Sequence, residues 1–132
     1  LPLAGAAERA RQATGLAVPL ARSGVADGPH DFESRLERAL PRLRRLKVMV
    51  PEKHDLVLMK VVRGDEHDLQ AIEAMHRRSP LELPVLVKRY REEMSATIID
   101  PGRLRGQFLT MVERLFPEGV DEVVKRLGAR GR

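Results

Sequence analysis

The chain has 132 residues, a length that fits one domain with its own hydrophobic core. It has no cysteine, which excludes disulfides, thiol catalysis and zinc–thiolate sites, and its net charge of +5 favours an anionic partner. Only 3% of the residues are aromatic, so the core must be built from Leu, Val, Met and Ile, and no apolar run approaches the roughly 20 residues that span a membrane.

The first thirty residues predict two short elements and a loop. Residues 4–14 have the pattern of a short helix that Gly15 ends. Residues 16–20 resemble a strand, in which Pro19 favours an edge position. Residues 23–31 are rich in Gly and Asp and predict a loop.

The next segment predicts one weak helix and one strand. Residues 32–40 show a weak helical pattern that Pro41 ends. Residues 46–50 alternate in hydropathy and contain β-branched side chains, which predicts a strand that Pro51 closes.

The remainder of the chain has helical periodicity, with breaks at glycine and proline. Gly64 is well placed as the C-terminal cap of one helix, and Asp65 as the N-cap of the next. Residues 128–132 form a basic tail that we expect to fray. The predicted helices cover residues 52–63, 65–77, 83–97, 100–116 and 119–127.

These elements predict a single domain over residues 1–132 of the α+β class, predominantly α. Residues 1–50 form a mixed part with a small remnant sheet of one or two strands, and residues 51–132 form a helical part of about five helices. Two strands alone make a marginal sheet. Either partner strands are missing, or another chain covers an exposed strand edge, as in a homodimer.

The strongest candidate for chemistry surrounds Gly64. Lys60 precedes this glycine, Asp68 follows it, and the reversal of the chain at Gly64 would bring both to one surface. A lysine beside carboxylates suits a nucleoside triphosphate, because the ammonium group binds phosphates. The alternative is that these residues have only structural roles. Asp65 would cap a helix, the Asp68 carboxylate would interact favourably with the dipole at the N-terminus of that helix, and Lys60 would be solvated.

A set of fixed spacings extends this segment into a longer motif. Its residues are Pro51, Asp55, Leu56, Lys60, Arg63, Gly64, Asp68, Leu69 and Ile72. The pattern resembles the C-terminal part of minimal nucleotidyltransferase-fold proteins related to the toxins of type IV abortive-infection systems, over residues 46 to about 116. The resemblance implies that Lys60, Arg63 and Asp68 form the nucleotide-binding residues, with Lys60 on the phosphates and Asp68 supporting the site.

The metal-binding motif of that family has no counterpart in the chain. In that family, a glycine–serine turn followed by a D-x-D pair holds Mg²⁺, and the 132 residues contain no D-x-D. The nearest substitute is Ser23-Gly24 with Asp27 and Asp31, but their order and spacing differ from the motif and the segment predicts a loop. We therefore assign no catalytic and no metal-binding residue. The first residue, Leu1, is not Met, which agrees with a partial domain.

The resemblance implies a function for an intact homologue and leaves activity of this chain open. The homologue would transfer a nucleotide from an NTP to RNA, such as tRNA, or to protein, using Mg²⁺. The present chain would be a partial or degenerate nucleotidyltransferase-like domain in the cytoplasm, not catalytic alone unless the metal site is supplied, and bound to no cofactor by itself.

The alternative is a non-enzymatic helical module that binds a protein partner or a nucleic acid. Two interpretations of its basic clusters stay open: they share one binding face, or they are spread over solvated helix faces. The clusters are Arg42-Arg44-Arg45-Lys47, Arg77-Arg78, Lys88-Arg89-Arg91 and Lys125-Arg126.

Overall fold

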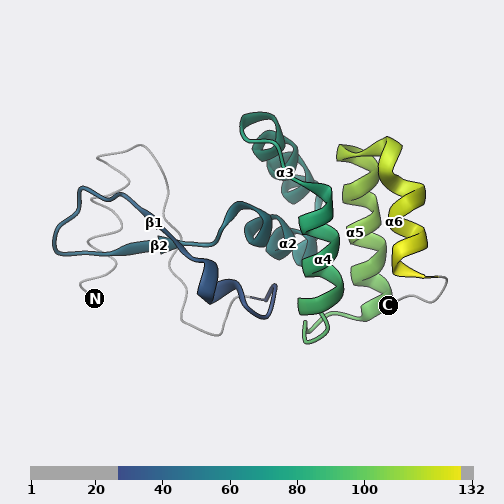
Figure 1. The fold of residues 1–132 in the computed structure, drawn as a ribbon, viewed down its shortest axis with the longest axis horizontal. Helices are drawn as coiled ribbons and strands as arrows, with labels where there is room; N and C mark the ends of the chain where they lie inside the picture. The colour runs from purple at the N-terminus through teal and green to yellow at the C-terminus, as the bar shows by residue number, and fades with distance from the viewer. Residues whose placement is uncertain (1–26, 129–132) are drawn as a thin grey trace. The chain divides into compact units, whose positions relative to one another are not determined.

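The structure, a computed structural model, describes residues 27–128, and over these residues the fold is α+β and predominantly α, as predicted (Figure 1). The described chain divides into two compact units, residues 36–50 and residues 27–35 with 51–128. The helix predicted at residues 4–14 and the strand predicted at residues 16–20 lie outside the described part. None of the described helices is long and apolar enough to cross a membrane.

The first unit contains a small antiparallel β-hairpin. β1 (Glu37–Ala39) pairs with β2 (Val48–Val50), with Glu37 opposite Val50 and Ala39 opposite Val48. The strand predicted at residues 46–50 is therefore confirmed, shortened to its last three residues. Together the two strands are the small remnant sheet that the sequence predicted.

The prediction of a helix at residues 32–40 is wrong. This segment makes one 3₁₀ turn, η1 (Phe32–Arg35), and then becomes β1. Leu40 has a φ of 51°, which helical backbone does not allow, and it turns the chain into the connection toward β2. Backbone hydrogen bonds to β2, a partner distant in sequence, outweigh the weak local helical pattern.

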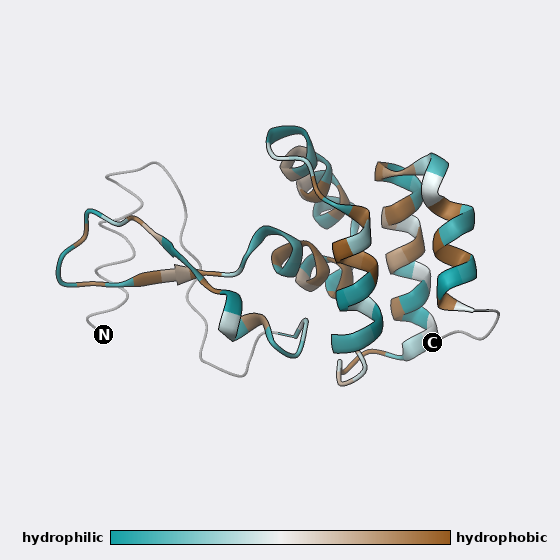
Figure 2. Ribbon diagram, viewed as in Figure 1, coloured by the Kyte–Doolittle hydropathy of each residue, from teal (hydrophilic) through white to brown (hydrophobic). Residues whose placement is uncertain are grey.

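The second unit contains five α-helices, matching the number and approximate positions predicted. They are α2 (Lys53–Arg63), α3 (Glu66–Arg78), α4 (Leu83–Glu93), α5 (Pro101–Leu115) and α6 (Val120–Leu127). A 3₁₀ turn, η2 (Pro117–Gly119), leads from α5 into α6. In Figure 2 the helices carry both hydrophobic and hydrophilic bands, as expected of helices that bury one face.

α4 ends four residues earlier than predicted, at Glu93 instead of Thr97. In a longer helix the carbonyl oxygen of Glu93 would accept from the N–H of Thr97. Here it accepts from the N–H of His30 at 2.9 Å, and the N–H of Ile98 donates to the Asp27 carboxylate at 3.0 Å. The segment before η1 thus takes over the hydrogen bonds that would have extended α4.

The core of the second unit lies between α2 and α5. α2 packs against α3, α4 and α5, and α5 also packs against α3 and α6. The rings of Tyr90 and Phe108 stack with centroids 4.2 Å apart, joining α4 to α5. The most deeply buried apolar side chains are Val57, Leu58, Ile72, Leu86, Phe108, Met111 and Val112.

Candidate functional site

The turn between α2 and α3 has the conformation that its sequence predicts. Gly64 has a φ of 66°, in the left-handed region that favours glycine, and its N–H donates to the carbonyl of Lys60 at 2.8 Å. Asp65 is the N-cap of α3 and accepts from the N–H of Asp68 at 2.9 Å. The Asp68 carboxylate in turn accepts from the N–H of Asp65, which completes a capping box.

Gln107 of α5 also binds this turn. The side-chain amide nitrogen of Gln107 donates to the carbonyls of Val61 and Val62 at 2.5 and 3.0 Å. These carbonyls belong to the last turn of α2, which has no intrahelical partners for them. A Cβ on Gly64 would collide with the Gln107 amide, so any other residue at this position would have to displace that side chain.

Arg63 and Asp68 form an ion pair across the turn. The Asp68 side chain is 0% exposed and accepts from Nε and Nη2 of Arg63 at 2.7–3.1 Å, whereas the Arg63 side chain is 71% exposed. Hydrogen bonding to Arg63 lowers the pKa of Asp68 below its ordinary value, against the opposing effect of burial. Nη1 of Arg63 has no hydrogen-bond partner among residues 27–128.

Lys60 is the third predicted site residue, and its ammonium group has no partner among residues 27–128. It lies three residues before Arg63 on α2, a spacing that places the two side chains side by side. Lys60 is half-buried, and its side chain makes no hydrogen bond or ion pair with any residue from 27 to 128. The structure therefore joins Arg63 to Asp68 and leaves Lys60 without a bond to either.

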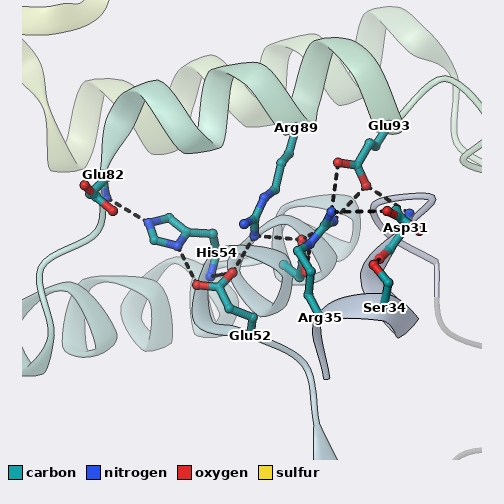
Figure 3. Close-up of polar contacts among 9 residues, drawn as sticks. Asp31, Ser34, Arg35, Glu52, His54, Glu82, Arg89 and Glu93 are labelled. Carbon is teal, nitrogen blue, oxygen red and sulfur yellow. Dashed lines mark hydrogen bonds and ion pairs between the residues drawn. The ribbon is translucent and has the colours of Figure 1, made fainter. Parts of the chain in front are cut away.

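A larger ionic network lies at the beginning of α2, and sequence analysis did not find it. Asp55 is fully buried and accepts from Arg35 at 2.7 and 2.9 Å and from Arg89 at 3.1 Å. Arg35 also donates to Glu93 on α4 at 2.7 and 3.1 Å, as Figure 3 shows. The only sequence signal was Asp55 inside the family motif, because its partners are 20 or more residues away.

His54 extends this network toward the N-terminus of α4. Its Nε2 accepts from the backbone N–H of Glu82 at 2.9 Å, and its Nδ1 lies 2.7 Å from the Glu52 carboxylate (Figure 3). A backbone N–H only donates, so Nε2 carries a lone pair and the proton sits on Nδ1. Glu52 also binds Arg89. Burial alone would raise the pKa of Glu52, but hydrogen bonds from His54 and Arg89 bring it below its ordinary value.

The buried carboxylates are not arranged to hold Mg²⁺. Both oxygens of Asp68 accept from Arg63, and both oxygens of Asp55 accept from arginines. A magnesium ion needs carboxylate oxygens that are free to face it. Within residues 27–128, no group of three or more His, Asp or Glu side chains could hold a metal ion. The described carboxylates therefore do not fit the metal.

A cavity of the helical unit is lined by other residues. It has a volume of about 500 Å³ and is lined by the end of α4, the α4–α5 connection, α5 and α6. Its walls are mainly apolar, from Met94, Leu104 and Leu127, and none of the predicted site residues lines it. This cavity is therefore not part of the predicted site.

Comparison with known proteins identifies one family. A family model described as "Nucleotidyltransferase of unknown function (DUF6036)" matches residues 16–113, a segment that includes Lys60, Arg63 and Asp68. No curated protein and no solved structure matches the chain.

Proposed function

The chain belongs to this family of nucleotidyltransferases of unknown function, and from that membership we propose that its α2–α3 turn binds the phosphates of a nucleoside triphosphate. The observation that carries the proposal is the ammonium group of Lys60, a half-buried residue whose side chain has no partner within residues 27–128. An ammonium group in that state gains most from an anionic ligand. The last turn of α2 thereby offers a cationic site for phosphate.

Arg63 and Asp68 have distinct roles in this proposal. Arg63 holds Asp68 with Nε and Nη2 and keeps Nη1 for a second phosphate oxygen beside Lys60. Asp68 does not touch the ligand, because its carboxylate is buried and occupied. It is a positioning residue, which fixes Arg63 and caps α3.

In an intact relative this site would serve transfer of a nucleotide from an NTP to RNA or protein, with Mg²⁺ polarising the phosphates. We place the chain near the toxins of type IV abortive-infection systems, in the cytoplasm. The chain alone binds the nucleotide and does not transfer it, because its sequence has no D-x-D and its buried aspartates are bound to arginines.

Nucleotide binding by Lys60→Met tests the proposal, measured by calorimetry with each of the four NTPs. Loss of a charge-assisted contact should weaken binding about 10- to 100-fold. Lys88→Met is the matched control, because Lys88 is an exposed lysine on α4 with no bond to residues 27–128. Absence of NTP binding, or equal affinities for the two variants, would contradict the proposal.

A transfer assay tests the second half of the proposal. The chain is incubated with labelled NTP, Mg²⁺ and tRNA, and label on the RNA is measured. We expect none. Transfer that disappears in Lys60→Met would show that the catalytic carboxylates lie within the 132 residues after all.

One observation favours a binding module as the second candidate function. The described sheet contains only β1 and β2, so each strand has one edge without a described partner. Such an edge can pair with a second copy of the chain. Light scattering over a range of concentrations would detect this homodimer, and a monomer throughout would count against it.

A further inference from the structure

Charge is distributed unequally between the two compact units. Residues 36–50 carry five Lys and Arg against one acidic residue, Glu37, a net charge of +4. Residues 27–35 and 51–128 carry fourteen Lys and Arg against seventeen Asp and Glu, a net charge of −3. The hairpin unit is thus the cationic part of the described chain, although it contributes only a small share of its residues.

The two units also differ in how their cations are paired. In the helical unit several arginines bind carboxylates, as Arg63 binds Asp68 and Arg114 binds Glu66, whereas other cations, such as Arg77 and Lys88, have no partner among residues 27–128. In the connection between β1 and β2, no cation binds a carboxylate of residues 27–128. Its basic hairpin loop consists of four exposed residues without a hydrogen bond or ion pair to any residue from 27 to 128: Arg42, Arg44, Arg45 and Lys47.

Residues 1–26 offer little to neutralise this loop. Residues 1–26 contain one acidic residue, Glu8, and three arginines. Four cations within six positions repel one another, and an anionic ligand would relieve that repulsion. A ligand that carries several negative charges in a row would suit this loop.

We propose that the basic hairpin loop binds the phosphate backbone of a nucleic-acid strand. Three of its four residues are arginines, which bind phosphate oxygens bidentately. Six consecutive residues extend over at most about 20 Å, enough to reach several phosphates. This assignment rests on the nucleotidyltransferase function proposed above. In that reaction the loop would hold the RNA strand that accepts the nucleotide.

A nucleic acid fits this surface better than an acidic protein does. Stable protein interfaces are centred on buried aromatic or aliphatic anchors. The loop contains no aromatic residue, and its leucines Leu43 and Leu46 are half-buried within the hairpin unit. Without an aromatic platform for bases, binding should depend on backbone charge and little on sequence.

The test compares two triple variants of the full chain, R42A/R44A/R45A and R77A/R78A/K88A. The second set removes the same charge from exposed helical positions that lack partners among residues 27–128. Binding to a labelled single-stranded RNA 12-mer is measured by fluorescence anisotropy at several salt concentrations, without NTP. Circular dichroism verifies that both variants fold.

The loop variant should bind RNA about 10- to 100-fold more weakly than wild type, with a slope of log K against log salt that is shallower by about 2. The helical variant should retain the wild-type slope. R42K/R44K/R45K should also retain it, because the charge is conserved. Lys60→Met should bind RNA normally, so that failure of NTP binding and failure of RNA binding are separate results.

Three results would overturn the assignment. They are no RNA binding by the wild-type chain, equal losses in the two alanine variants, and displacement of RNA by polyglutamate at equal charge concentration. The last result would assign the loop to an acidic protein.

Discussion

Arg35 binds the buried carboxylate of Asp55 with two hydrogen bonds, from Nε at 2.7 Å and from Nη2 at 2.9 Å. Arg35 is the last residue of η1, immediately before the chain enters the hairpin unit. Its second partner, Glu93, is the last residue of α4. One guanidinium group therefore attaches the segment before the hairpin to both α2 and α4.

Replacing Asp55 by Ala should destabilise the protein by about 3–5 kcal/mol, because two arginines of this network would each lose a buried carboxylate partner. Urea unfolding monitored by circular dichroism measures the change. Glu113→Ala is the matched control, since this exposed carboxylate has no bond within residues 27–128. Equal midpoints for the two variants would show that the network adds nothing to stability.

Stability should fall as the solution is acidified. The pKa of Asp68 is lowered by hydrogen bonding to Arg63, and that of Glu93 is lowered by Arg35 although burial opposes it. The unfolded chain therefore binds more protons than the folded one as pH falls through about 4. The contribution of these ionised carboxylates to the free energy of unfolding is complete above that pH and is lost below it.

Urea midpoints measured between pH 7 and pH 3 would show this decline. In Asp68→Asn the curve should be flatter at the acidic end, because one of the carboxylates with a lowered pKa is gone. A wild-type midpoint that does not move over this interval would refute the prediction.

Two glycine substitutions should have opposite effects. Gly64→Ala should destabilise by about 1–2 kcal/mol, because its φ of 66° strains an L side chain and the new Cβ would displace Gln107. Gly106→Ala in α5 should stabilise by about 0.5–1 kcal/mol, because a Cβ there meets no atom within 4 Å. Thermal unfolding of both variants measures the difference, and the same sign for both would contradict the argument.

His54 should be neutral with its proton on Nδ1, as the hydrogen bond from the Glu82 N–H requires. Long-range ¹H–¹⁵N NMR spectra distinguish the two ring nitrogens. His67, which is exposed at the first turn of α3, serves as the internal control, because no hydrogen bond to residues 27–128 selects one of its two ring nitrogens. A proton on Nε2 of His54 would mean that the contact with Glu82 does not form.

Local sequence determined most of the helical unit. Gly64 and Asp65 marked the α2–α3 turn because each acts through its own backbone or through a residue three positions away. The helix predicted at residues 32–40 was wrong because that prediction also used local sequence alone. Local periodicity contains no information on the pairing of β1 with β2.

Only the tertiary structure shows which charged side chains have partners and which have none among the described residues. Lys60, Arg63 and Asp68 were all candidate nucleotide-binding residues in the sequence, but folding buries Asp68 against Arg63 and leaves Lys60 without a partner in the described chain. The same holds for Arg35, Asp55 and Glu93, whose bonds join residues 20 to 58 positions apart. Spacing along a helix predicts contacts within about four residues, and longer contacts depend on how helices pack, which no single segment encodes.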